Sequence, residues 1–448
     1  MTMAEAAGLI ADWLWTVGFF LLSILIIVFV HEFGHYIVGR LSGIRAEVFS
    51  LGFGRVLWSR HDRQGTRWQL AAIPLGGFVK FLGDANAASA NPDLETLARL
   101  SADERRHTLH GAPLWARAAT VLAGPLFNVA LSVAVFALMV TIWGVVRLED
   151  RPVVSLPRAL PGAAQTLRAG DVILAVDGIE TPDVAALYTA ASALVAAPGS
   201  AYRVLRAGEE LTLDGPFLLP PVVGAILPRS AAIDAGLRSG DVILAVDGIA
   251  VSGFAQLSPL VEAAAGAPVT LSVWREGTSF DLTLTPRRRD QPTEDGGFVT
   301  RWQIGFYSAM AFDLAAQRPG LAETLALAWA GTVRVADASL DGLVAIVRGQ
   351  ISSCNISGAI TMAQVMGDAA KSGLESFLGM LAVLSLGIGL MNLLPVPVLD
   401  GGHLMFHAFE AIAGRPPSSK ALERLTLIGL ALVLGLMVYA LRNDLVCV

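Results

Sequence analysis

Four long stretches without charged residues stand out along the chain, and each is long enough to cross a bilayer. They run from Trp13 to Val30, from Ala118 to Val146, from Phe377 to Leu399 and from Leu425 to Leu441. A membrane helix needs about 20 predominantly apolar residues, with a range of roughly 17–25. The pattern therefore predicts a polytopic α-helical membrane protein with about four transmembrane helices.

The stretches between these runs have other patterns of apolar and polar residues. Residues 41–117 contain short apolar strands broken by glycines, which predict a membrane-reentrant β-region followed by a connector; a small cytoplasmic sheet is the alternative. Residues 147–310 alternate apolar and polar positions between turn residues, as short strands do. Residues 321–350 mix apolar and charged positions at helical spacing, which predicts an amphipathic helix on the membrane surface or clasping the spans.

A ten-residue sequence, GDVILAVDGI, occurs twice without change, beginning at Gly170 and again at Gly240. An identical segment at this distance indicates two copies of one small domain, over residues 147–220 and 221–310. Each copy ends its apolar strand in an Asp-Gly pair, at Asp177 and Asp247, which is typical of a hairpin turn. The acidic residues of the repeat are therefore expected to serve turns rather than catalysis.

Composition supports the membrane class and limits the remaining functions. Hydrophobic residues make up 54% of the chain and charged residues 16%, which is typical of a membrane protein. The net charge of −6 does not indicate the basic surface that binds nucleic acids. Eleven Lys and Arg residues lie between Arg40 and Arg117, which predicts a cytoplasmic location for that region and an external one for both termini and the repeat. The two cysteines, Cys354 and Cys447, cannot supply a thiolate zinc site.

The motif HEFGH closes the first apolar run and carries the chemistry. On a helix, His31 and His35 are four residues apart and share one face, so both imidazoles can bind one metal ion beside Glu32. Ionisable side chains cost several kcal/mol inside a membrane helix and usually line a site. Three of them within five residues predict a zinc hydrolase at bilayer depth.

A catalytic zinc site needs a third protein ligand and an open position for water. Asp400 is the best candidate because it follows the third apolar run, where an unpaired carboxylate would be costly; His403 and Asp84 are weaker candidates. Zinc lowers the pKa of a bound water towards about 7, and Glu32 could take its proton and pass it to the leaving amine. Asn128, in the second run, serves either an interhelical hydrogen bond or the site itself.

The motifs together resemble one family. HEFGH in the first span, AGPLFN in the second, duplicated domains similar to PDZ domains and NLLPVPVLDGGH in the third span resemble the site-2 proteases, and the resemblance covers nearly the whole chain. It implies zinc ligation by His31, His35 and Asp400, and catalysis by Glu32. The substrate-binding residues that the resemblance implies are Asn392, Pro395, Pro397, Gly76 and Gly77.

The resemblance also implies a fold and a function. The fold is four transmembrane helices, a membrane-reentrant β-region and two periplasmic α+β PDZ-like domains, in a multi-pass protein of the bacterial inner membrane. The function is regulated intramembrane proteolysis of single-span membrane proteins, such as trimmed anti-sigma factors in the envelope stress response or signal-peptide remnants. A loop QIGFYS at Gly305 could hold a peptide carboxylate, whereas PFLLPP in the first copy lacks the glycine. The alternative is a non-enzymatic PDZ scaffold.

The expected segments, in chain order, are the first transmembrane helix with HEFGH (1–40), the β-region and connector (41–117), the second transmembrane helix (118–146), the two repeat domains (147–220 and 221–310), the amphipathic helix (321–350), the third transmembrane helix with the LDG motif (375–403) and the fourth transmembrane helix (425–441).

Overall fold

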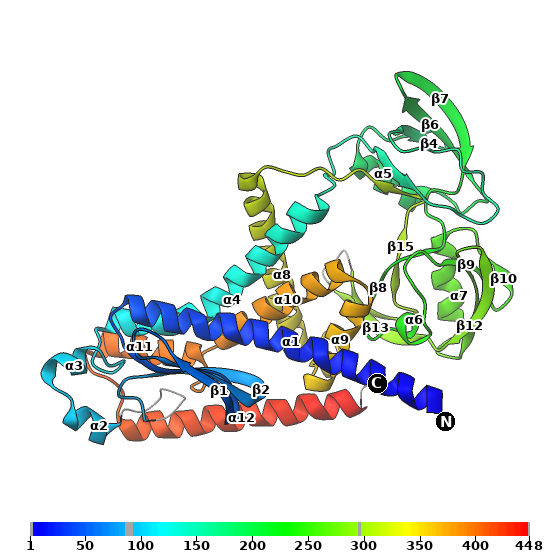
Figure 1. The fold of residues 1–448 in the computed structure, drawn as a ribbon. Helices are drawn as coiled ribbons and strands as arrows, with labels where there is room; N and C mark the ends of the chain where they lie inside the picture. The colour runs from blue at the N-terminus through cyan, green and yellow to red at the C-terminus, as the bar shows by residue number, and fades with distance from the viewer. Residues whose placement is uncertain (1–2, 86–92, 294–296, 447–448) are drawn as a thin grey trace.

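The structure is a computed structural model that describes residues 3–85, 93–293 and 297–446 (Figure 1). Four of its described helices are long and apolar enough to cross a membrane. These helices are α1 (Met3–Leu41), α4 (Leu114–Trp143), α10 (Leu374–Asn392) and α12 (Ser419–Val446). The chain is therefore a multi-pass membrane protein, as its uncharged stretches predict.

Helices α1, α4 and α10 form the core of the membrane part together with the shorter α9 (Ala359–Lys371). Buried apolar side chains such as Ile27 and Leu381 pack between them. Ser132 donates a hydrogen bond from Oγ to the carbonyl of Ala382 at 2.7 Å, which ties α4 to α10. Because lipid tails are as apolar as leucine, such packing and interhelical hydrogen bonds hold membrane helices together.

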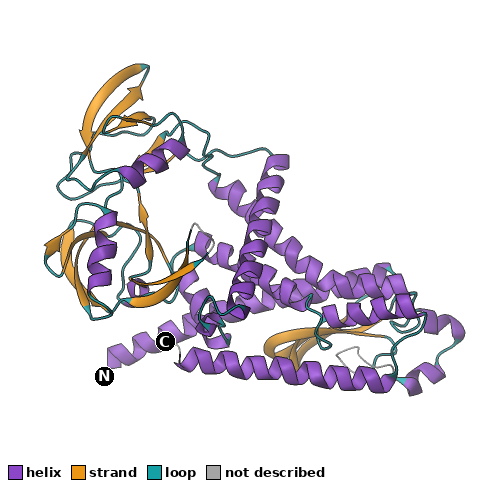
Figure 2. Cartoon of the chain, turned by 180° about the vertical axis from the view of Figure 1, so that it is seen from behind, coloured by secondary structure: helices purple, strands orange, loops and turns teal. Residues whose placement is uncertain are grey.

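The β-region is one long hairpin that folds back on itself and lies against α1 (Figure 2). Strands β1 (Ala46–His61) and β2 (Arg67–Phe81) are antiparallel, and Leu51 has partners on both sides, Gly77 on one and Leu70 on the other. Towards the tip, Leu57 and Trp58 are 64% and 56% exposed. Helices α2 (Leu94–Arg99) and α3 (Ala102–Arg106) follow, and residues 86–92 of the expected connector lie outside the described residues.

The helix expected over residues 375–403 is two helices. Helix α10 ends at Asn392, and a new helix, α11 (Asp400–Ala413), begins after a turn. Pro395 and Pro397 lie in the turn, where they lack the N–H groups that a continuing helix would need. The break places the LDG motif at a helix start rather than inside a transmembrane helix.

The two halves of the sequence repeat form two separate sheets. In the first repeat domain the main sheet has the order β5-β4-β6-β7, with α5 beside it, and β3 pairs with β16. The elements are β3 (Val154–Pro157), β4 (Val172–Val176), β5 (Ile179–Glu180), α5 (Val184–Ala193), β6 (Ser200–Arg206), β7 (Glu209–Gly215) and β16 (Phe312–Leu314). The first domain thus extends beyond residue 220, because Phe312 is buried in its core.

The second repeat domain lies between the two segments of the first. Its sheet has the order β12-β11-β9-β8-β15, with β10 paired to β9, and a separate hairpin joins β13 to β14. The elements are β8 (Val222–Ile226), α6 (Ala231–Asp234), β9 (Val242–Val246), β10 (Ile249–Ala250), η1 (Phe254–Gln256), α7 (Leu257–Ala263), β11 (Val269–Arg275), β12 (Thr278–Leu284), β13 (Arg287–Pro292), β14 (Phe298–Gln303) and β15 (Phe306–Ala309).

The repeated aspartates have structural roles. Asp177 and Asp247 adopt left-handed backbone conformations, with φ of 49° and 48°, as hairpin turns require. Asp171 is 1% exposed and takes two hydrogen bonds from Arg206. Burial opposes the ionisation of Asp171, but the hydrogen bonds from Arg206 outweigh it and hold its pKa below the ordinary value. Asp241 makes the matching pair with an arginine of β11.

Helix α8 (Leu321–Val347) packs against α4 through its buried side chains and leaves large apolar ones such as Trp329 exposed. The short helix η2 (Ser353–Asn355) follows, and its Cys354 is disulfide-bonded. The second cysteine of the chain, Cys447, lies outside the described residues.

Candidate metal centre

The two histidines of HEFGH face each other across one turn of α1. Their Nε2 atoms are 3.2 Å apart and their ring centroids 4.8 Å apart. This follows from the helix itself, because residues four apart lie on the same face. His31 and His35 therefore present two nitrogen ligands to one point.

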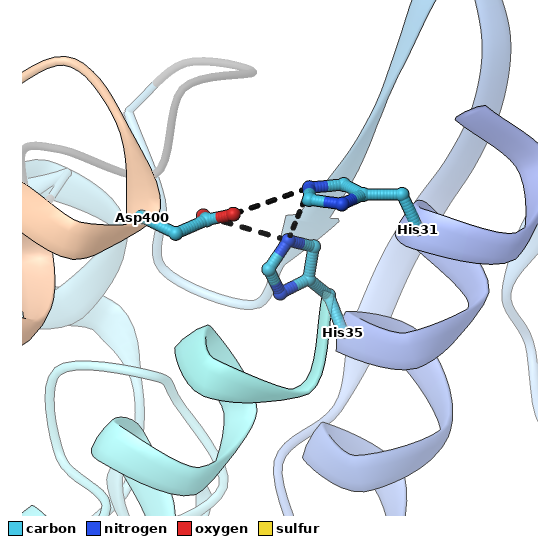
Figure 3. Close-up of side chains that lie close together, drawn as sticks. All are labelled: His31, His35 and Asp400. Atoms are coloured by element: carbon cyan, nitrogen blue, oxygen red, sulfur yellow. Dashed lines mark hydrogen bonds and ion pairs between the residues drawn. The ribbon is translucent and has the colours of Figure 1, made fainter. Parts of the chain in front are cut away.

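Asp400 completes the group from a distant part of the chain (Figure 3). One of its carboxylate oxygens lies 3.1 Å from Nε2 of His31, and the other 3.5 Å from Nε2 of His35. Ligands at about 2.0–2.1 Å from a tetrahedral zinc ion lie about 3.3 Å from one another, so these separations fit. Within the described residues this is the one group found that could hold a metal, and neither His403 nor Asp84 belongs to it.

Helix α4 orients both imidazoles. His35 donates from Nδ1 to the carbonyl of Thr120 at 2.8 Å, which leaves Nε2 free to bind a metal. The amide of Asn128 lies 3.2 Å from Nδ1 of His31, and Asn128 is fully buried. Its Oδ1 has no hydrogen-bond partner among the described residues. An amide turned by 180° would accept the Nδ1 proton of His31, the arrangement that a zinc-bound histidine needs.

Gly124 allows α4 to come this close. A Cβ atom at this position would lie 2.3 Å from Nε2 of His35 and 2.9 Å from Cε1 of His31. Only glycine leaves room for both rings. Thr120, Gly124 and Asn128 are spaced by four residues, so they share the face of α4 that covers the site.

Glu32 lies beside the three ligands without joining them. Its carboxylate is hydrogen-bonded to the backbone of Val79 in β2. A Cβ atom on Gly77 would lie 3.0 Å from Cγ of Glu32 and 2.8 Å from the carbonyl oxygen of Ser50, so β2 approaches this side chain closely. The strand and the metal group thus hold Glu32 between them.

A cavity of about 750 Å³ joins these groups. Of the substrate-binding residues predicted from sequence, Asn392, Gly76 and Gly77 line it. Pro395 and Pro397 are not among its lining residues; Pro397 instead packs on α12, where a Cβ on Gly429 would meet it at 3.1 Å. The prolines therefore shape the turn that positions Asp400.

The cavity wall also contains a charged pair that no sequence pattern predicts. Arg117 at the start of α4 donates two hydrogen bonds, at 3.0 and 2.6 Å, to the carboxylate of Glu410 on α11. The two side chains are 15% and 18% exposed, and a two-pronged pair of this kind fixes geometry as well as charge. It ties the helix that carries Asp400 to the helix that orients the histidines. No local motif links residues so far apart in the sequence.

Comparison with known proteins settles the family. Residues 19–436 match the description "Peptidase family M50". This chain belongs to that family, the site-2 proteases. A predicted zinc metalloprotease of Rhizobium meliloti is 36% identical, with 96% of each chain covered. One from Agrobacterium fabrum is 35% identical, with 95% of this chain and 94% of the relative covered.

A third relative is the regulator of sigma E protease of Salmonella typhi, which is 32% identical with 96% of this chain and 98% of the relative covered. The resemblance seen in the sequence is thereby confirmed. The chain is a membrane-embedded zinc metalloendopeptidase. The alternative of a non-enzymatic scaffold is wrong.

Proposed function

We propose that this protein cuts single-span membrane proteins inside the bilayer, with zinc held by His31, His35 and Asp400. The observation that carries the proposal is the spacing of these three groups near the C-terminal end of the transmembrane helix α1, with Glu32 beside them. When bound there, zinc supplies Lewis acidity to the substrate carbonyl and acidifies a water molecule. Glu32 would accept a proton from the water whose oxygen bonds to the carbonyl carbon, and would deliver it to the leaving amine as the C–N bond breaks.

The substrate must be unwound, because helical carbonyls are locked in hydrogen bonds. The segment Gly77–Phe81 of β2 pairs with β1 along one edge only among the described residues. Since Val79 turns its backbone towards Glu32, Gly77 presents its own backbone groups on the same side. We propose that the substrate adds to this edge as an extended strand, with Asn392 on the far side of the cavity.

We place the protein in the bacterial inner membrane, with the repeat domains and both termini periplasmic. The basic residues of the β-region support a cytoplasmic site by the positive-inside rule. The disulfide at Cys354, in the segment between α8 and α9, fits the oxidising side. We infer that the substrates are anti-sigma factors already trimmed by another protease, and signal-peptide remnants.

We further propose that both repeat domains are PDZ modules and that only the second binds a peptide carboxylate. Its Gly305 has φ of 95°, and the N–H groups of Ile304 and Gly305 donate to no group among the described residues. In the second domain the backbone N–H of Leu227 donates to the carbonyl of Gly305, and in the first domain the backbone N–H of Arg158 donates to the carbonyl of Ala311. Ala311 is therefore the position in the first domain that corresponds to Gly305. This differs from the PFLLPP position expected from sequence.

The test is cleavage by Glu32→Gln protein in vesicles that contain a single-span anti-sigma factor. We expect no cleavage with zinc content unchanged, since Glu32 is not a ligand. Membrane proteins that accumulate in cells carrying the variant, identified by mass spectrometry, name the substrate. Cleavage at the wild-type rate would end the proposal.

A further inference from the structure

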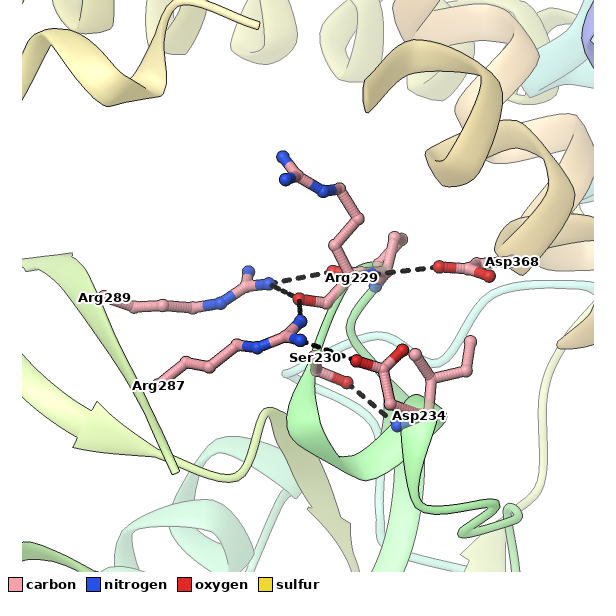
Figure 4. Close-up of polar contacts among 8 residues, drawn as sticks. Arg229, Ser230, Asp234, Arg287, Arg289 and Asp368 are labelled. Carbon is pink, nitrogen blue, oxygen red and sulfur yellow. Dashed lines mark hydrogen bonds and ion pairs between the residues drawn. The ribbon is translucent and has the colours of Figure 1, made fainter. Parts of the chain in front are cut away.

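The second repeat domain is attached to the membrane part by a small polar contact (Figure 4). The backbone N–H of Arg229 donates to Oδ2 of Asp368 on α9 at 3.0 Å. A second contact joins Asp290 of β13 to the N–H of Ser352 and the side chain of Asn355, at 3.3 and 3.1 Å. Burial raises the pKa of Asp368 above its ordinary value, and the hydrogen bond from Arg229 only partly offsets this effect. Among the described residues, three hydrogen bonds join the second repeat domain to α9 and to the segment before it, so the attachment is light.

Arg229 is held in an uncommon conformation. Its φ is 52°, in the left-handed region that arginine rarely adopts. Its carbonyl accepts hydrogen bonds from Arg287 at 2.9 Å and from Arg289 at 2.7 Å, and Arg289 also donates to the carbonyl of Pro228 (Figure 4). Backbone strain that the surroundings enforce in this way is common at switch regions.

The strained turn is coupled directly to the open loop at Gly305. The N–H of Leu227 donates to the carbonyl of Gly305, and the N–H of Ala232 donates to that of Ile304, both at 3.0 Å. These two bonds flank the turn at Arg229 on either side. A Cβ atom on Gly305 would lie 2.3 Å from Cβ of Ser230, so the backbone of Gly305 packs directly against Ser230. A shift of the loop must therefore move the turn.

Strand β14, which leads into this loop, already donates to one carboxylate. The N–H of Trp302 donates to Oε2 of Glu262 on α7 at 3.1 Å. The first repeat domain lacks the open site, because the N–H of Ala311 donates to the carbonyl of Leu218 at 3.1 Å. Of the two repeat domains, as far as their described residues show, the second alone combines open N–H groups with the coupled turn, and it touches α9.

We propose that a peptide carboxylate bound to the N–H groups of Ile304 and Gly305 weakens the contact between Arg229 and Asp368 and releases the second repeat domain from α9. This rests on the proposed peptide site. A carboxylate that accepts from these two N–H groups shifts the loop at Gly305, and the hydrogen bonds from Leu227 and Ala232 pass the shift to the turn at Arg229. The released domain uncovers α9, which packs against α1, the helix that carries the metal-binding histidines.

The contact itself is tested by hydrogen exchange resolved at single amides, on the full-length, zinc-loaded protein in detergent micelles. A hydrogen bond to a charged group contributes enough that its loss speeds exchange by about tenfold. We expect this at the Arg229 amide in Asp368→Ala, and a smaller increase in Asp368→Asn, which keeps an acceptor oxygen. The matched control is Asp341→Ala, an exposed aspartate on α8, which should leave the rate unchanged. Equal rates at Arg229 in all four proteins would overturn the contact.

The coupling is tested with two probes, an apolar hexapeptide with a free C-terminal carboxylate and the same peptide with a C-terminal amide. The Glu32→Gln protein is used so that neither probe is cut, and the readout does not depend on proteolysis. We expect the acid to slow exchange at Gly305 and to speed it at Arg229 by about threefold or more, and the amide to do neither. Slower exchange at Gly305 with no change at Arg229 would refute the coupling. No effect at Gly305 would refute the peptide site and the inference with it, while leaving the proposed protease chemistry untouched.

Discussion

Replacing Gly124 by alanine places a methyl group inside the metal centre. The new Cβ would lie 2.3 Å from Nε2 of His35 and 2.5 Å from its Cε1, whereas ordinary contact begins at 3.4 Å. The imidazole must therefore retreat by about 1 Å, which far exceeds the tolerance of about 0.2 Å in a zinc–nitrogen bond. Changes that only disturb the partners of a ligand lower metal affinity by about 10–100-fold. We expect the loss in Gly124→Ala to be at least about 100-fold.

The assay is zinc affinity by chelator competition on the purified protein, with metal content measured by mass spectrometry and folding by circular dichroism. Gly387→Ala is the matched control, because it makes the same change in a transmembrane helix where a Cβ would meet no atom within 4 Å. The control should bind zinc as the wild type does. Zinc affinity of Gly124→Ala within threefold of the control would refute the close approach of α4 to the histidines.

Three further substitutions test contacts of His31, Glu32 and Asp171. Asn128→Ala removes the group that orients His31, so zinc affinity should fall about 10–100-fold in the same competition assay; an unchanged affinity would contradict the role of the amide. Gly77→Ala adds a methyl group that displaces the side chain of Glu32 but contacts no metal ligand, so kcat should fall tenfold or more at normal zinc content. A normal kcat would contradict the close approach of β2 to Glu32. Arg206→Gln removes the ionic partner of the buried Asp171 and should destabilise the first repeat domain. Because the pKa of that aspartate is lowered in the folded state, the contribution of the pair is present above about pH 4 and is lost as the pH falls below it, so the variant should lose less stability on acidification than the wild type. Hydrogen exchange of β4 in the full-length protein measures both effects, and equal exchange rates at neutral pH would contradict them.

The metal centre could be predicted from sequence because local rules decide most of it. The spacing of His31 and His35 alone puts both rings on one helical face. Asp400 is the best candidate for the third metal ligand because an unpaired carboxylate at an apolar helix end would lack hydration. The structure places Asp400 beside the two histidines. Zinc and the protease activity are confirmed by the family, while the roles of Glu32 and Asn392 stay predictions.

The rest depends on contacts between segments that lie far apart in the chain. Nothing near Arg117 indicates that it pairs with Glu410, and nothing near Gly124 indicates that two rings lie against it. The first repeat domain is completed by Phe312, well past its expected end, because a strand that follows the second domain fills its core. Patterns of alternation give the strands but not the order in which separate segments pair.

Zinc K-edge X-ray absorption on the purified protein and on Asp400→Ala tests whether His31, His35 and Asp400 bind zinc. We expect one zinc ion per chain with two imidazole nitrogens and one carboxylate oxygen at about 2.0–2.1 Å, and a loss of the carboxylate oxygen in the variant. Stoichiometric zinc with the same ligand shell in both proteins would contradict this expectation.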